Sequence, residues 1–320
     1  MYPSSVHGSS ERCDDDVERL RTNLPEAADV IECFDRPLAS LSGIGRDRLD
    51  AVDVAVVLGD PSELIGELPR LAWVQMITTG IDHVDTAALA TADIRLTTAA
   101  GTSSPEIAEF VVARLLEQWK RLPELADLQL GHRWDPLYGR PLQGSKILLV
   151  GFGAINRAVA TRLAPFQVEL RAVRRSVSMD VPDVSVITFD ELDAGLAWAD
   201  AVLVALPGHP DLDGLFDARR FAEMRPGTFF CNVGRGSAVC ESALTDALAS
   251  GHLGGVALDV TRVEPLPPDD ELWGSGARIS PHCSSAPEVA ISRVLDLTSE
   301  NLRRFAAGSR MHNEVSFDAE

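Results

Sequence analysis

Short apolar runs recur along the chain, and stretches with helical spacing or turn residues separate them. Each run is predicted to be a β-strand. The runs lie at residues 30–34, 54–58, 73–76, 94–96, 147–150, 168–173, 201–206, 228–233, 256–260 and 278–280. Continuous apolar strands that alternate with helices are typical of parallel sheets covered on both faces. The pattern therefore predicts an α/β fold.

Two long helices and one irregular arm are also predicted. Residues 107–116 follow a cap-rich break and carry apolar side chains at helical spacing, as do residues 287–307. The second helix is expected to return to the first domain. Residues 121–143, with Trp134, Tyr138 and several prolines, are predicted to form an irregular arm. Such an arm packs against a partner subunit or covers its own domain, and the pattern leaves both open.

The strand at 147–150 leads into the turn Gly151-Phe152-Gly153 and a predicted helix at 154–163. In such a unit the first glycine allows a tight turn, and the second lets a pyrophosphate approach the backbone. The helix N-terminus offers unpaired N–H groups to an anion. Asn156 occupies the third glycine position, where helix and strand pack closest, which weakens the match. The turn binds a dinucleotide or is an ordinary buried strand-to-helix turn.

The end of the next strand bears on which dinucleotide would bind. An NAD site usually has Asp or Glu about 20 residues past the glycines, whereas an NADP site has Arg. Here the strand ends in Arg174, Arg175 and Ser176. Two guanidinium groups and a hydroxyl suit a 2′-phosphate. This pattern favours NADP over NAD, and the alternative is a solvated arginine pair.

Polar residues follow successive predicted strands of the second half. They are Arg235, Asp259 with Glu264 beyond it, and His282. Because the carboxyl ends of parallel strands share one edge, these side chains are expected to converge. Taken singly, each has a structural alternative, such as a strand cap, a solvated loop or a hydrogen-bonded core histidine.

Composition and charge exclude several classes of protein. The 320 residues allow two domains, and the net charge of −19 disfavours binding to nucleic acid or to anionic membranes. No apolar run reaches the roughly 18 residues of a membrane span. Residues 1–16 do not resemble a secretory signal. Five scattered cysteines without a CxxC pair disfavour a disulfide framework and a metal site, so a reducing cytoplasm is the expected setting.

The order and spacing of these motifs resemble the D-isomer specific 2-hydroxyacid dehydrogenases, of the glyoxylate and hydroxypyruvate reductase kind. The segments that carry the resemblance are residues 73–85, 147–158, 199–207, 232–239, 257–267 and 280–282. The resemblance implies two doubly wound parallel-sheet domains with the active site in the cleft between them. It places the substrate domain at residues 1–98 and 288–320, and the dinucleotide-binding Rossmann domain at 99–287. It also suggests a homodimer built through the nucleotide domain and the arm.

The resemblance further implies roles for individual residues. Arg235, Glu264 and His282 would form the catalytic trio, and Thr79, Gly80 and Ile81 would offer backbone N–H groups to the substrate carboxylate. The cofactor-binding residues would be Gly151, Gly153, Ala154, Ile155, Arg174, Arg175, Ser176, Leu206, Pro207, Val233 and Asp259, with Asp259 on the nicotinamide carboxamide.

Physical chemistry supports the trio independently. Reduction of a 2-oxo acid needs a cation for the carboxylate and the carbonyl, a proton donor, and a hydride source. The planar fork of Arg235 matches a carboxylate, and an imidazole such as His282 exchanges protons near neutral pH. Glu264 in contact with the ring would favour the protonated form. The expected reaction is hydride transfer from NADPH to a small 2-oxo acid, giving the D-2-hydroxy acid.

Some positions depart from the family pattern, and two other functions stay open. His209 and Leu212 stand where Thr is usual, and Ser284 and Ser285 follow His282. Cys283, beside His282, is expected to be a small buried residue. A formate dehydrogenase is disfavoured because that resemblance expects Gln at position 264. A dinucleotide-sensing corepressor with the same fold is the alternative from a different class.

Overall fold

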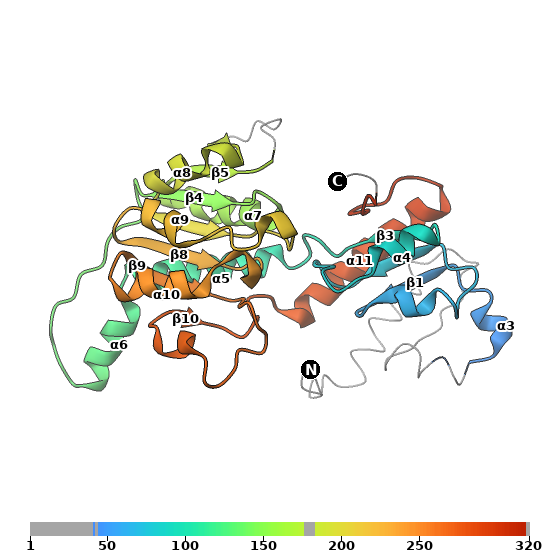
Figure 1. Ribbon diagram of the computed structural model, residues 1–320, viewed down its shortest axis with the longest axis horizontal. Coiled ribbons are helices and arrows are strands. Elements are labelled where there is room, and N and C mark those ends of the chain that lie inside the picture. Colours follow the sequence, from blue (N-terminus) through green and yellow to red (C-terminus); the bar gives the residue numbers. More distant parts are fainter. Residues whose placement is uncertain (1–40, 42–43, 176–182, 318–320) are drawn as a thin grey trace. The chain divides into compact units, whose positions relative to one another are not determined.

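A computed structural model describes residues 41, 44–175 and 183–317 (Figure 1). The predicted strand at 30–34 and Ser176 lie outside these residues. The chain divides into two compact units, one of residues up to Thr102 together with those from Pro287 on, the other Ser103–Ala286. The expected domain boundaries, after residues 98 and 287, stay a prediction. Each unit is described by itself.

The first unit contains a three-stranded parallel sheet in the order β1-β2-β3. The strands are β1 (Val54–Val57), β2 (Trp73–Met76) and β3 (Arg95–Thr97), which confirms the predictions to within one residue at each end. The helices are α3 (Arg46–Leu49), η1 (Pro61–Leu64), α4 (Thr86–Thr91) and the long α11 (Pro287–Ala306), which was also predicted. The C-terminal segment covers the outer edge of β3, where the Val315 N–H donates to the Leu96 carbonyl at 2.9 Å.

Buried polar side chains tie α11 to the middle of this sheet. Gln75 of β2 is fully buried, and its Oε1 accepts hydrogen bonds from Thr97 Oγ1 at 2.8 Å and from Asn301 Nδ2 of α11 at 3.1 Å. The Trp73 indole donates to Thr97 Oγ1 at 2.9 Å and stacks at a tilt on Phe305. Since each of these buried polar groups has a hydrogen-bond partner, burying them costs little free energy. The same hydrogen bonds hold α11 against β2.

The second unit contains a seven-stranded parallel sheet in the order β10-β9-β8-β7-β4-β5-β6. The strands are β4 (Lys146–Val150), β5 (Glu169–Val173), β6 (Val184–Ile187), β7 (Ala201–Val204), β8 (Thr228–Asn232), β9 (Leu253–Leu258) and β10 (Arg278–Ile279). The α-helices are α5 (Ser104–Trp119), α6 (Leu122–Leu130), α7 (Ala154–Leu163), α8 (Leu192–Trp198), α9 (Ala218–Glu223) and α10 (Glu241–Ala249). The 3₁₀ turns are η2 (Ala164–Phe166), η3 (Phe189–Glu191), η4 (Pro210–Leu212), η5 (Gly236–Ala238) and η6 (Glu271–Gly274).

Helices cover both faces of this sheet, and successive residues of β4 show why. Leu148 packs into a core with α8, α9 and α10, whereas Ile147 and Leu149 pack into a second core with α5 and α7. Side chains alternate between the two faces of a strand, so a strand buried on both faces must be apolar throughout. The predicted α/β fold with doubly wound parallel sheets is confirmed, and the order of strands reverses between β4 and β7.

The prediction of an irregular arm at 121–143 is wrong in its first part. Leu122–Leu130 forms α6, with Pro123 in the first turn, where a missing N–H costs nothing. None of its residues is buried, and Leu122, Leu125 and Leu130 are exposed. Beyond α6, Trp134 is 98% exposed and Tyr138 is 85% exposed. The middle of the arm is therefore exposed, whereas its end packs on its own unit: Arg140 lies over the Trp119 ring at 4.2 Å, and Leu142 is buried in the core with Ile147 and Leu149.

Candidate active site

The glycine turn after β4 has the geometry of an anion site. Gly151 has φ +83°, and a Cβ there would lie 2.7 Å from the Ala205 carbonyl oxygen, so only glycine fits. A Cβ on Gly153 would meet nothing within 4 Å. Gly153 is the N-cap of α7 and makes no side-chain cap, so the N–H groups of Ala154 and Ile155 stay available. An open space in front of a helix N-terminus fits a pyrophosphate.

Asn156 is accommodated in place of the third glycine by a set of hydrogen bonds. Its side chain is 1% exposed, and Nδ2 donates to the carbonyls of Gly151 at 2.7 Å, Val150 at 3.2 Å and Leu203 at 3.3 Å. These bonds connect α7 to the ends of β4 and β7. The Asn156 side chain was expected to weaken the packing of helix on strand, but its hydrogen bonds stabilise the turn instead.

Arg174 follows β5 directly and is half-buried, while Arg175 beside it is exposed. The backbone N–H of Arg174 donates to the Ile187 carbonyl at 3.1 Å, which holds the residue against β6. Its Nη1 is buried and has no hydrogen-bond partner among the residues described. Leaving a buried guanidinium N–H without an acceptor costs free energy. Binding of an anion next to Arg174 would supply the missing acceptor.

Arg235 is carried by a tight turn after β8. Asn232, fully buried at the end of β8, accepts from the Gly234 N–H at 3.0 Å, and its Nδ2 donates to the Arg235 carbonyl at 2.8 Å. A Cβ on Gly236 would overlap the backbone of Thr261 in the loop after β9. The Arg235 and Glu264 loops are therefore in direct backbone contact. Asn232 was not predicted, although a polar residue at the end of an apolar strand is a usable signal.

Glu264 and His282 form a hydrogen-bonded pair. Glu264 Oε2 lies 2.8 Å from His282 Nδ1, and Glu264 Oε1 accepts from the Thr261 N–H at 3.1 Å. The side chains are 38% and 44% exposed, so the pair is open to a reactant. A carboxylate on Nδ1 orients the ring, and it leaves Nε2 as the atom available to exchange a proton.

Asp259 holds the loop that carries His282. Its buried carboxylate accepts from Ser280 Oγ at 2.8 Å, Cys283 N at 3.0 Å and Ser284 N at 3.1 Å, and its carbonyl accepts from His282 N at 2.9 Å. His282 itself has φ +50°, a conformation that needs such support. Sequence reasoning missed this role. The expectation of a buried Cys283 is wrong, because this residue is exposed.

The remaining predicted cofactor residues lie around the glycine turn. Leu206 is buried, and its side chain and backbone approach Gly151 and Gly234. Val233 is buried and donates from its N–H to the Val204 carbonyl at 3.0 Å, while Pro207 is exposed. Leu206 and Val233 therefore form part of the apolar surface beside the glycine turn, at the carboxyl edge of the sheet.

Thr79, Gly80 and Ile81 belong to the first unit and follow β2. Thr78 Oγ1 donates to the Gly80 carbonyl at 3.0 Å, and Thr79 Oγ1 donates to the Ala99 carbonyl at 3.3 Å. Within the described chain, the backbone N–H groups of Thr79, Gly80 and Ile81 have no hydrogen-bond acceptor. This loop is therefore able to bind a carboxylate.

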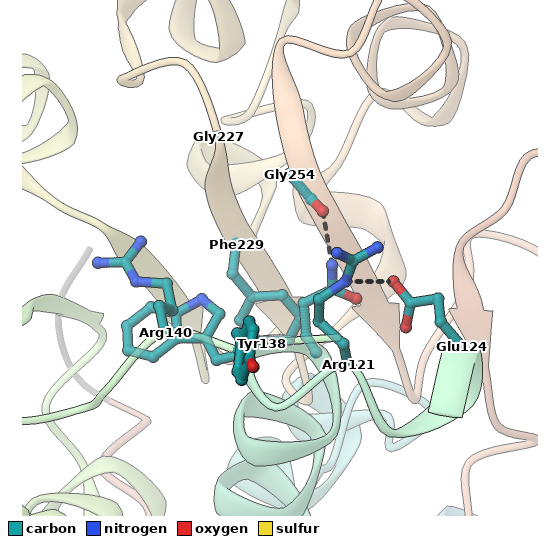
Figure 2. A pocket seen from close by; sticks show the side chains of 10 residues that line it. Arg121, Glu124, Tyr138, Arg140, Gly227, Phe229 and Gly254 are labelled. Atoms are coloured by element: carbon teal, nitrogen blue, oxygen red, sulfur yellow. Dashed lines mark hydrogen bonds and ion pairs between the residues drawn. The ribbon is translucent and has the colours of Figure 1, made fainter. Parts of the chain in front are cut away.

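A cavity of about 390 Å³ lies at the opposite edge of the large sheet. Figure 2 shows Tyr138 and Arg140 of the arm beside Phe229 of β8, and Arg121 next to Glu124 at 3.1 Å. Phe229 is near the amino end of β8, whereas Arg235 follows its carboxyl end. This cavity is thus separate from the candidate active site.

The profile for the NAD binding domain of the D-isomer specific 2-hydroxyacid dehydrogenases matches residues 112–284, more than half of the chain. The chain belongs to this family. It is accordingly an NAD(P)-dependent oxidoreductase, and the second unit contains the dehydrogenase's dinucleotide-binding domain. The corepressor alternative receives no support from the relatives found.

Individual members of the dehydrogenase family are similar over most of the chain. A glyoxylate reductase of Thermofilum pendens is 31% identical over 294 residues, 87% of this chain and 86% of the relative. The chain spans about half, 51%, of the D-3-phosphoglycerate dehydrogenase of Mycobacterium leprae, with 30% identity.

Two solved structures are similar along nearly their whole length. A family member from Xanthobacter autotrophicus Py2, in complex with NADPH and MES, has a TM-score of 0.77 at 28% identity and covers 95% of this chain and 94% of its own. An NADPH-dependent glyoxylate/hydroxypyruvate reductase from Sinorhizobium meliloti, in complex with NADP and sulfate, has a TM-score of 0.80 at 25% identity and 95% coverage of both chains. Among the described residues of this dehydrogenase, no helix is long and apolar enough to span a membrane.

Proposed function

We propose that this dehydrogenase uses NADPH to reduce a small 2-oxo acid, such as glyoxylate or hydroxypyruvate, to the D-2-hydroxy acid. The observation that carries the proposal is the 2.8 Å pair of His282 and Glu264, together with the backbone contact between the Glu264 loop and the Arg235 turn. A proton donor and a carboxylate-binding cation at the edge of a dinucleotide-binding sheet are the groups that such a reduction requires.

Each group has a proposed role in the reaction. Arg235 is proposed to bind the substrate carboxylate and to polarise the carbonyl, and Thr79, Gly80 and Ile81 are proposed to offer backbone N–H groups to a substrate carboxylate. His282 Nε2 gives its proton to the developing alkoxide, while Glu264 holds the ring through Nδ1. The nicotinamide of the cofactor supplies the hydride. In the oxidative direction, neutral His282 accepts the proton.

The direct test is the initial rate of NADPH and NADH oxidation with glyoxylate, hydroxypyruvate, pyruvate and a bulkier aromatic 2-oxo acid. The proposal expects a clear rate with NADPH and one or both of the first two acids. The names of the Thermofilum and Sinorhizobium proteins support this choice of substrates. Dinucleotide binding without turnover of any acid would refute the proposed activity.

The preference for NADPH rests on the arginines after β5. Arg174 has a buried Nη1 without an acceptor among the described residues, and Arg175 adds a second, exposed guanidinium. The adjacent Ser176 is proposed to add a hydroxyl donor. A 2′-phosphate would pair with these groups, whereas the 2′-hydroxyl of NAD would leave Arg174 only partly satisfied. The NADPH and NADP bound to the Xanthobacter and Sinorhizobium proteins support the same choice.

Replacing Arg174 and Arg175 together by Ala is expected to raise the KM for NADPH at least about 10-fold, because charge-assisted hydrogen bonds to the phosphate are lost. The KM for NADH should change much less. Arg219→Ala is the matched control, since this arginine makes an exposed ion pair with Asp193 at 2.6 Å. Equal increases for both cofactors would contradict the 2′-phosphate argument.

We propose a homodimer that forms through the second unit and its arm. Five large apolar side chains of the arm are exposed: Leu122, Leu125, Leu130, Trp134 and Tyr138. Apolar surface of this kind is typical of an interface. The cavity beside Tyr138 provides a concave surface in the same region (Figure 2).

Replacing Leu130 and Trp134 together by Asp is expected to convert the dimer to a monomer, because two charges would be buried at the interface. Sedimentation velocity at several protein concentrations measures the change. Phe166→Asp, at a 36% exposed position outside the arm, is the control. A wild-type protein that is monomeric at all concentrations, or a variant that stays dimeric, would contradict the proposed interface.

We also propose that the protein works in a reducing cytoplasm. The described cysteines, Cys231, Cys240 and Cys283, are all free thiols. Burial raises the pKa of the Cys231 thiol to about 12, so this thiol stays protonated and unreactive.

A further inference from the structure

The loop of residues 261–264, the Glu264 loop, has few hydrogen bonds to the rest of its unit. The Thr261 N–H donates to Glu264 Oε1 at 3.1 Å, and Thr261 Oγ1 donates to a carbonyl of the same loop at 2.8 Å. Among the described residues, one hydrogen bond joins the loop backbone to another part of the chain: the Arg262 N–H donates to Glu241 Oε1 at 2.7 Å. The place of this loop therefore depends on the Glu241 side chain.

Glu241 is a firm support because it belongs to a well-packed helix. It is the first residue of α10, whose Leu244 is fully buried in one of the two cores of the large sheet. The residue before it, Cys240, donates its N–H to the Phe216 carbonyl at 3.0 Å. A carboxylate in the first turn of a helix is also favoured by the helix dipole. The oxygen that accepts from the Glu264 loop is thus held in place by the core of the second unit.

The segment that carries Arg235 also carries Glu241. Arg235 is followed by η5, and α10 begins shortly after η5. A Cβ on Gly236 would overlap the backbone of Thr261 in the loop, and Glu241 accepts from the next residue, Arg262. The first contact joins two backbones, and the second is a charge-assisted hydrogen bond. The segment from Arg235 to Glu241 therefore holds the loop at two successive residues.

We propose that Glu241 is a positioning residue for the reduction. Its carboxylate holds the Glu264 loop against the Arg235 segment, so that the ring of His282, held by Glu264, faces the acid bound by Arg235. Glu241 contacts neither substrate nor cofactor in this role and acts through Glu264. The inference rests on the proposed function for the reaction, whereas the hold on the loop does not. The competing role of Glu241 is only to stabilise the start of α10.

Two variants of Glu241 separate these roles. Glu241→Ala removes the acceptor, whereas Glu241→Gln removes the charge and keeps a side-chain oxygen within reach of the Arg262 N–H. Asp246→Ala is the matched control, because it removes an exposed carboxylate from the same helix. Each full-length variant is measured for kcat with glyoxylate and hydroxypyruvate, for the KM of NADPH, for the melting temperature, and for hydrogen exchange of the loop amides by mass spectrometry.

The proposal expects Glu241→Ala to lower kcat about 10-fold with an unchanged KM for NADPH, because a small displacement of a proton donor slows proton transfer strongly. Glu241→Gln should regain most of the kcat, and Asp246→Ala should match the wild type. The loop amides of Glu241→Ala should exchange faster than those of the wild type. Unchanged kcat in Glu241→Ala would overturn the inference, as would an equal fall of kcat in Glu241→Gln.

A double variant tests whether the effect passes through Glu264. In a Glu264→Ala background, Glu241→Ala should lower kcat by less than about 2-fold, since the group that it positions is already absent. A loss as large as in the wild-type background would overturn the inference. If the wild type binds NADPH but reduces no 2-oxo acid, the proposed function fails. The exchange of the loop amides in Glu241→Ala then still decides whether Glu241 holds the loop, and unchanged exchange would refute that hold.

Discussion

His282→Gln is expected to lower kcat about 10²-fold or more, because the reaction loses its general acid. Gln keeps a polar side chain of similar reach, and its amide can still hydrogen-bond to Glu264, but it does not exchange a proton near neutral pH. The dissociation constant for NADPH should stay nearly unchanged, since the glycine turn and Arg174 are separate from this loop. Steady-state kinetics and a binding titration measure the two quantities.

The control for this substitution is His252→Gln. His252 precedes β9 at the amino edge of the sheet, and its Nε2 lies 3.0 Å from the Phe221 carbonyl. It should leave kcat near the wild-type value. Glu264→Gln adds a second comparison, because it removes the charge next to His282 Nδ1 while the ring remains. Its kcat should fall less than that of His282→Gln, and full activity in His282→Gln would refute the assignment of the acid.

Arg235→Lys is expected to lower kcat/KM for the 2-oxo acid by about 10²-fold, although the positive charge is kept. An ammonium group cannot make the two parallel hydrogen bonds that a guanidinium makes to a carboxylate. It also cannot contact the carbonyl oxygen at the same time. The loss should appear in both KM and kcat, because the side chain is proposed to bind the ground state and to stabilise the developing alkoxide.

The matched control is Arg262→Lys in the neighbouring loop. Arg262 pairs with Asp213 at 2.9 Å, and its side chain is 48% exposed, so the substitution should change kcat/KM little. Guanidinium ions added to Arg235→Ala offer a rescue experiment. An Arg235→Lys enzyme with wild-type kcat/KM would show that the carboxylate is bound elsewhere.

The Asn156 and Asp259 results show where sequence patterns are insufficient. Asn156 departs from the glycine pattern. Whether its side-chain amide would clash with its neighbours or hydrogen-bond to them depended on its distances to the Gly151, Val150 and Leu203 carbonyls. Asp259 was predicted only as a cofactor residue. Its bonds to Ser280, Cys283 and Ser284 join parts of the chain more than 20 residues apart. No local pattern encodes such contacts.

The arm illustrates the same limit for secondary structure. Prolines and aromatic residues in 121–143 suggested irregular chain, yet one of the prolines occupies the first turn of α6, where it is tolerated. The exposed face of α6 could not be predicted either. Whether an apolar face is covered depends on which other segments reach it in the folded chain.

The sequence by itself determined the α/β class, most of the described strands and the glycine turn, and it predicted the trio that is proposed as the catalytic group. These features depend on local periodicity and on motif order, because apolar strands, tight turns and polar strand ends each need particular residues at fixed spacing. The tertiary structure decided which donors and acceptors meet: the Glu264 and His282 pair, the support from Asp259 and Asn232, and the hydrogen bond from the Glu264 loop to Glu241. Such partners come from separate strand ends, and only the parallel sheet places those ends at one edge.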